Sequence, residues 1–249
     1  MSDHAGAPAS APLFQEIKTG PPERTYPYKR LSFLTYLVTT FATLNCLSMV
    51  VQLFALFGQG SLLARITQHA FASHDAMVDA ALASDRFVGI VAALSVLTLL
   101  ATYISSGFWI YRAAANVRAL GARGLETSPG WSVGWYAVPF MALFRPYQAM
   151  VQIYQASVSP MRWRLERAPP LLPIWWAAWI VCGLAGYAVS VMARLDRSLP
   201  SLRFWTNFQL VDICIDIAAA VLFLLVVWSV FRAQKASRVS MIDVATVFA

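Results

Sequence analysis

Two aspartates four residues apart in a long apolar stretch are the side chains of this chain best placed to do chemistry. Asp212 and Asp216 would share one face of a helix, with Gln209 one turn before them. If that stretch lies in a membrane, a carboxylate there is costly and by default suggests proton or ion handling. The position of the pair, near the outer end of the stretch, favours instead a structural pair with Gln52 or a loop arginine. Proton or ion handling and a contact with a partner stay open as alternatives. The loop arginines are Arg194, Arg197 and Arg203.

A second group of residues combines guanidinium groups with an amide. Arg112 and Asn116 are one helical turn apart, and Arg145 follows a short apolar segment over 131–144. The planar guanidinium group offers phosphate two parallel hydrogen bonds. The three residues are therefore a candidate site for an anionic lipid headgroup or a phosphate. The alternative is that the arginines only mark the end of a span, with their stems along apolar surface.

The other reactive side chains form no catalytic or metal-binding pattern. His69 and His74 are five residues apart, a poor spacing for two ligands on one helix face. The cysteines lie in apolar stretches without metal-ligand or redox spacing; they are Cys46, Cys182 and Cys214. We therefore expect no catalytic residue, cofactor or metal ion, and no enzyme.

The composition excludes an ordinary globular protein. Only 12% of the 249 residues are charged and 59% are hydrophobic, whereas soluble domains carry about 25% charged residues. The net charge of +7 is accompanied by no nucleic-acid-binding motif, so we expect no nucleic-acid partner.

Four apolar stretches are long enough to cross a bilayer, which takes about 20 helical residues. They predict an all-α integral membrane protein with four transmembrane helices, within a membrane domain over 31–232. Residues 1–30 are expected to form a disordered cytoplasmic tail and residues 233–249 a cytoplasmic C-terminal tail. The predicted spans are about 33–57, 87–111, 171–192 and 210–231.

Three shorter segments lie between these spans. Residues 61–84 alternate apolar and charged positions, and we expect one or two amphipathic helices there, on the outer interface. Residues 131–144 would reach only about 21 Å as a helix, too short to cross, so we expect a re-entrant or interfacial segment. Tyr147–Val158 is expected to be an amphipathic helix on the inner surface.

The basic residues predict the orientation. With both termini in the cytoplasm, 14 of the 19 lysines and arginines face inward, as the positive-inside rule requires. Such a face also attracts anionic lipid.

Three sequence words resemble a known family. W-I-Y-R-A-A-A-N-V-R-A-L-G-A lies at Trp109–Ala122, S-P-G-W-S-V-G-W-Y-A-V-P at Ser128–Pro139, and R-P-Y-Q-A-M at Arg145–Met150. In order and spacing they are similar to the bacterial membrane family called domain of unknown function 4328. The resemblance implies a multi-pass protein of the bacterial inner membrane. It implies no activity, cofactor or functional residue.

Three classes of function remain. The first is a membrane accessory or interaction protein that holds an anionic lipid on its basic face, with a membrane-protein partner or as a homo-oligomer. The second is a small oligomeric transporter or channel that uses Asp212 and Asp216, supported by a polar stripe in the first span. The third, a lipid-modifying enzyme, lacks a nucleophile and base. We expect the first class.

Overall fold

The computed structural model describes residues 25–195 and 199–247, except the side chains of 192–194, 199–200, 202–203 and 241–247. The predicted tail over 1–30 therefore lies largely outside the described residues. All regular elements within the described ranges are helices. The four long ones are α1 (Ser32–Thr67), α2 (His74–Ala119), α5 (Leu171–Leu195) and α6 (Leu199–Val247).

All four long helices are long and apolar enough to span a membrane. The predicted four-span, all-α architecture is confirmed, and each predicted span lies inside one of these helices. The helices are longer than the spans: α2 has 46 residues and α6 has 49, or about 70 Å each at 1.5 Å per residue. A hydrocarbon core is about 30 Å thick, so both helices extend well beyond it.

The separate amphipathic helices expected over 61–84 are absent, and that prediction was wrong. Helix α1 continues through Gly58 and Gly60 to Thr67, and α2 begins at His74. Glycine weakens a helix by only about 1 kcal/mol, so these two do not end it. The chain reverses within residues 68–73, where the side chain of Ser73 accepts a 3.2 Å hydrogen bond from the Ala76 amide and caps α2.

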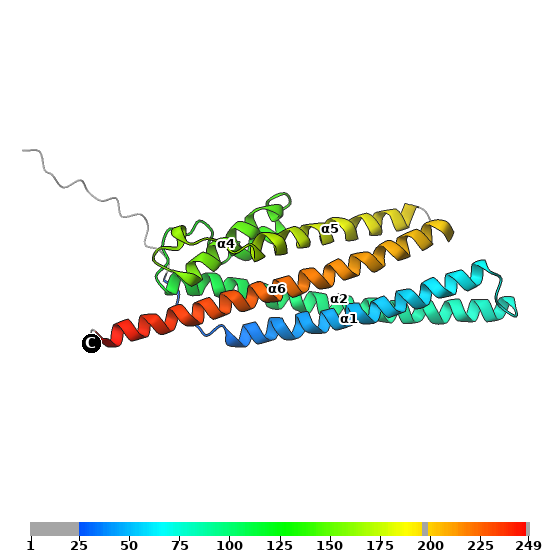
Figure 1. Cartoon of the computed structure of the whole chain (residues 1–249), viewed down its shortest axis with the longest axis horizontal. Coiled ribbons are helices and arrows are strands. Elements are labelled where there is room, and N and C mark those ends of the chain that lie inside the picture. The colour runs from blue at the N-terminus through cyan, green and yellow to red at the C-terminus, as the bar shows by residue number, and fades with distance from the viewer. Residues whose placement is uncertain (1–24, 196–198, 248–249) are drawn as a thin grey trace, which may run out of the picture.

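The long helices form two antiparallel hairpins joined along one seam. Helix α1 packs against α2, α5 packs against α6, and α1 also packs against α6, which lies between the other helices (Figure 1). Polar side chains of α1 accept hydrogen bonds from other helices inside this bundle. The Trp228 indole of α6 donates to Thr39 (3.2 Å), and Thr98 of α2 donates to Asn45 (3.1 Å). Such bonds between helices suit a lipid environment.

The chain between α2 and α5 folds over one end of the bundle. It forms α3 (Trp131–Gly134), the 3-10 turns η1 (Trp135–Ala137) and η2 (Met141–Leu143), α4 (Arg145–Val158) and η3 (Trp163–Leu165). Residues 131–144 are thus divided among short turns, and none is long enough to cross a membrane. Helix α4 includes the predicted Tyr147–Val158 and packs mainly on α6.

Most of the cationic side chains gather at that same end, which we call the basic end. Helix α1 begins there, α2 ends there, and α6 passes it on the way to the C-terminus, whereas the turn between α1 and α2 lies at the opposite, hairpin end (Figure 1). The largest buried core lies in this half of the bundle and includes Trp109, Met150, Trp175 and Val230. The basic end carries Arg112, Arg118, Arg123, Arg145, Arg162, Arg164, Arg167, Arg232, Lys235 and Arg238.

This arrangement predicts the sidedness of the chain. In a variant whose three native cysteines are replaced by alanine, a single cysteine at Ala70 should react with a membrane-impermeant maleimide from one side. Single cysteines at Arg123, Gln148 and Lys235 should react only from the other side. Reaction of Gln148 from the side of Ala70 would show that residues 131–144 cross the membrane.

Candidate functional site

Asn116 is the centre of a buried polar network at the basic end. Its side chain is fully buried. The amide nitrogen donates to the Lys29 carbonyl (2.8 Å) and to Oε1 of Gln234 (3.2 Å), while the amide oxygen accepts from the Lys29 N–H (3.1 Å). One side-chain amide therefore pairs with both main-chain groups of Lys29, and it ties the segment before α1 to α2 and α6.

Gln234 extends the network to α4. Its amide nitrogen donates to the Ala113 carbonyl (3.0 Å) and to the Ser157 hydroxyl (3.1 Å). Ser237, one turn further along α6, donates to the Ser157 carbonyl (2.7 Å). Leaving a buried amide unpaired lowers the stability of the fold by about 1–3 kcal/mol. These bonds therefore fix the register of α2, α4, α6 and the N-terminal segment relative to one another.

Arg112 holds the same N-terminal segment one turn earlier. Its Nη2 donates to the Pro27 carbonyl. Its Nε is buried and has no hydrogen-bond partner within the described residues. On the other side of the segment, the Arg238 guanidinium lies over the Tyr28 ring, 4.6 Å from its centroid. Arg112, Asn116 and Arg238 thus place residues 26–29 against the helices.

Arg145, the first residue of α4, lies over the first of two tryptophan rings that pack on each other. Its guanidinium is 5.7 Å from the centroid of the Trp135 ring, and its Nη1 donates to Gln148 Oε1 at 3.3 Å. The Trp135 ring packs in turn on Trp131, with centroids 4.5 Å apart. Arg145 is therefore connected to Trp131 through one indole ring.

A groove of about 620 Å³ lies between the N-terminal segment with α2 and the segment that contains Trp131. Tyr26 and Tyr111 form the wall that Arg112 holds in place. Trp131 belongs to the wall that Trp135 and Arg145 support. The lining residues are Tyr26, Tyr111, Ser128, Gly130, Trp131 and Gly134.

The structure thus gives the three predicted residues different positions. Arg112 and Arg145 each contact neighbours of the residues that line one groove, but neither lines the groove itself. Asn116 lies behind one wall, where its amide bonds to the protein itself. The sequence analysis missed Gln234 and Ser157. The only available signal was a glutamine shortly after the last apolar turn of the fourth span, which periodicity alone does not distinguish from a surface residue.

The two aspartates lie on the side of α6 that faces α5. Asp212 is only 8% exposed, and its Oδ2 is 3.8 Å from the position that a β-carbon on Gly186 would take. Asp216 is half-buried and lies near the Cys182 thiol. Neither carboxyl bonds to Gln52 within the described residues. Pairing with the predicted arginines cannot be described, because the side chains of Arg194 and Arg203, and all of Arg197, lie outside the described part.

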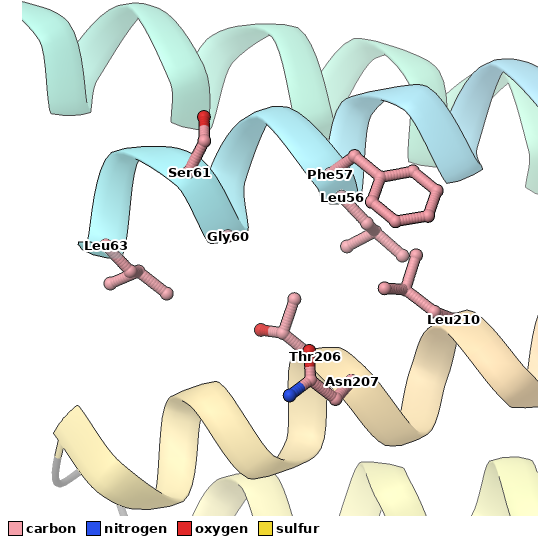
Figure 2. A pocket seen from close by; sticks show the side chains of 8 residues that line it. All are labelled: Leu56, Phe57, Gly60, Ser61, Leu63, Thr206, Asn207 and Leu210. Carbon is pink, nitrogen blue, oxygen red and sulfur yellow. The ribbon is translucent and has the colours of Figure 1, made fainter. Parts of the chain in front are cut away.

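A second groove, of about 240 Å³, lies near the hairpin end between α1 and α6. Figure 2 shows Leu56, Gly60 and Leu63 of α1 across from Thr206 and Leu210 of α6, whereas the Ser61 side chain points away from α6. It is lined mainly by apolar side chains and lies on the α1 side of α6. Asp212 points to the α5 side, so the groove and the carboxyl pair are separate features.

The network makes a prediction about Asn116. Replacing Asn116 by Leu should leave the Lys29 main-chain groups and Gln234 Oε1 without partners, and should lower the free energy of unfolding by about 2 kcal/mol or more. The N-terminal segment should also detach more readily, so trypsin should cleave faster after Lys29 and Arg30. Thermal unfolding and timed proteolysis in mild detergent measure both effects.

Asn207→Leu is the matched control, because Asn207 is exposed at the hairpin end. It should change neither stability nor cleavage by much. If the two variants are cleaved equally fast after Lys29, the network does not hold the segment.

Comparison with known proteins identifies a family and nothing more specific. No curated protein and no solved structure matches the chain. The family described as "Domain of unknown function (DUF4328)" matches residues 73–232, well over half of the chain, from the start of α2 through the three sequence words into α6. The chain therefore belongs to the DUF4328 family, as the three words predicted.

Proposed function

We propose that this protein is a membrane accessory protein that binds an anionic phospholipid in the groove at its basic end. In this proposal the basic end faces the cytoplasm and the protein resides in the inner membrane of a bacterium. The proposed activity is binding, with no catalytic step and no cofactor.

One observation carries the proposal: each of two arginines contacts residues that line a single groove or stand next to its lining, although neither arginine lines the groove itself. Arg112 lies beside Tyr111 and bonds to Pro27, next to Tyr26, while Arg145 is connected to Trp131 through Trp135. A phosphate at the mouth of the groove would meet positive charge from both sides. Charge-assisted bonds from a guanidinium to phosphate are about twice as strong as neutral hydrogen bonds.

The lining of the groove suits a lipid better than a soluble anion. Its side chains are mostly aromatic, with Tyr26, Tyr111 and Trp131 beside one serine hydroxyl. Tyrosine and tryptophan are amphipathic and are enriched where a bilayer meets water. An acyl chain could therefore lie along these rings while its headgroup stays near the arginines.

Arg112 has a donor to spare for such a headgroup. Its Nη2 is used by the Pro27 carbonyl, but its Nε has no partner within the described residues. A buried donor without a partner is unfavourable. The Nε is closed to solvent in this arrangement, so a phosphate would bond to it only after the guanidinium turned toward the groove, and the bond would then supply the missing partner. Lysine at this position would keep the charge and lose the fork of donors.

The groove can be filled without disturbing the fold, which gives a direct test. A β-carbon on Gly130 would meet no atom within 4 Å, and the backbone of Gly130 is helical, with φ −66°. Gly130→Leu should place its side chain in the groove and reduce the occupancy of phosphatidylglycerol about tenfold, the equivalent of roughly 1.4 kcal/mol. Native mass spectrometry of the purified protein titrated with phosphatidylglycerol measures the occupancy.

Two controls separate groove binding from general charge. Gly89→Leu adds the same side chain to an open position on α2 near the hairpin end and should leave the occupancy unchanged. Arg112→Lys should reduce it, whereas Arg162→Lys, at an exposed arginine of the basic end, should not. Equal occupancy in the Gly130→Leu and Gly89→Leu variants, or equal binding of phosphatidylcholine, would overturn the proposal.

A further inference from the structure

The seam between α5 and α6 brings two carboxyl groups together with small and polar side chains inside the membrane-spanning region. Asp212 of α6 faces Gly186 of α5. One turn further along α6, Asp216 faces Cys182, which lies one turn before Gly186 on α5. Because the helices are antiparallel, the two pairs lie at successive levels of the same seam. The lack of a side chain on Gly186 is what leaves room for the Asp212 carboxyl.

One carboxyl oxygen of Asp212 is buried without a partner among the described residues. The residue is 8% exposed, and its Oδ1 is inaccessible to solvent and accepts no hydrogen bond from any described residue. An ionised carboxylate that is buried without a partner is unfavourable by several kcal/mol, and in practice such a group becomes neutral instead. The surroundings of Asp212 therefore favour a neutral carboxylic acid.

The titratable neighbours among the described residues supply no compensating positive charge. Asp216 would only add a second negative charge on the same helix face. From α5 comes the Cys182 thiol, and from α2 the Tyr103 hydroxyl, which interacts with Trp179 and lies near Asp216. Neither carries a positive charge. The side chains of Arg194 and Arg203, and Arg197, lie outside the described part.

A metal ion does not fit this place as well as a proton does. No three His, Cys, Asp or Glu side chains among the described residues are grouped to hold a metal ion. A hard cation such as Ca²⁺ or Mg²⁺ needs about six oxygen ligands, and the seam offers two carboxyl groups on successive turns. A proton needs only one oxygen.

We propose that Asp212 is a proton-binding group in the membrane-embedded α5–α6 seam and carries its proton in the resting protein. The proton comes from water and binds one carboxylate oxygen, so that the carboxyl enters the apolar seam without charge. This site is distinct from the lipid groove at the basic end, and neither depends on the other. It gives the protein a second, proton-linked property in the hairpin half of the bundle.

Infrared spectroscopy of the protein in liposomes tests the proposal directly, because a neutral carboxylic acid has a carbonyl band separate from that of a carboxylate. At neutral pH the wild-type protein should show this band, and Asp212→Asn should remove it. Asp85→Asn, at an exposed carboxylate on α2, should leave it unchanged. An unchanged band in Asp212→Asn overturns the proposal, as does a band lost only in Asp216→Asn.

A second test leaves Asp212 in place and gives its carboxyl group a new hydrogen-bond donor. A serine at Gly186 fits, since its β-carbon would be in ordinary contact with Asp212 Oδ2 at 3.8 Å. Its hydroxyl could donate to the carboxylate and favour the ionised form, so the neutral band should disappear at a lower pH than in the wild type. Gly183→Ser, at an open position of α5, should have no effect. If the two serine variants behave alike, or if sodium chloride abolishes the wild-type band at constant pH, the site does not bind a proton as proposed.

Discussion

The polar network around Asn116 is the constraint on which the rest of the basic end depends. An amide that is fully buried must have partners for its donors and its acceptor, because an unpaired group in a medium of low dielectric is unfavourable by about 1–3 kcal/mol. Asn116 meets this requirement with Lys29 and Gln234, which lie 87 and 118 residues away in the sequence. Gln234 meets the same requirement with Ala113 and Ser157. Four segments of the chain can therefore come together in only one register, and a slip of any one of them would leave several polar groups unpaired.

The candidate lipid groove is a consequence of this register. The wall that contains Tyr26 exists because Asn116 and Arg112 hold the main chain of residues 27–29. The opposite wall exists because residues 131–144 break into short turns that stack Trp131, Trp135 and Arg145. Asn116 thus positions the N-terminal segment beside the groove, and the two arginines contact residues next to its lining. The bonds of Asn116 to Lys29 and Gln234 account for an asparagine among alanines near the end of α2.

The hairpin half of the bundle follows a different principle. There α1 and α2 are joined by a small polar cluster of Asn45, Ser48 and Thr98, and much of the helix surface is left for lipid. Of the buried side-chain oxygens without a described partner, in Ser95, Ser106 and Asp212, only that of Asp212 belongs to an acidic group. The protein therefore combines a paired polar network around Asn116 at one end with an unpaired carboxyl oxygen in the other half. The first fixes how the segments at the basic end come together, and the second is the group to which we assign proton binding.

The amino-acid sequence by itself determined the four spans, the helical class, the gathering of basic residues at one end and the family, because each follows from local composition or from contiguous words. It also predicted that residues 131–144 cannot form a crossing helix. It was wrong about residues 61–84, since an amphipathic pattern does not distinguish a surface helix from the extension of a long one. Only the tertiary structure decided what the candidate residues touch: that Asn116 binds Lys29 and Gln234, that Arg112 bonds to Pro27 and Arg145 lies over Trp135, and that Asp212 faces Gly186. Those contacts join residues far apart in the chain, and they depend on how helices pack, which no local pattern encodes.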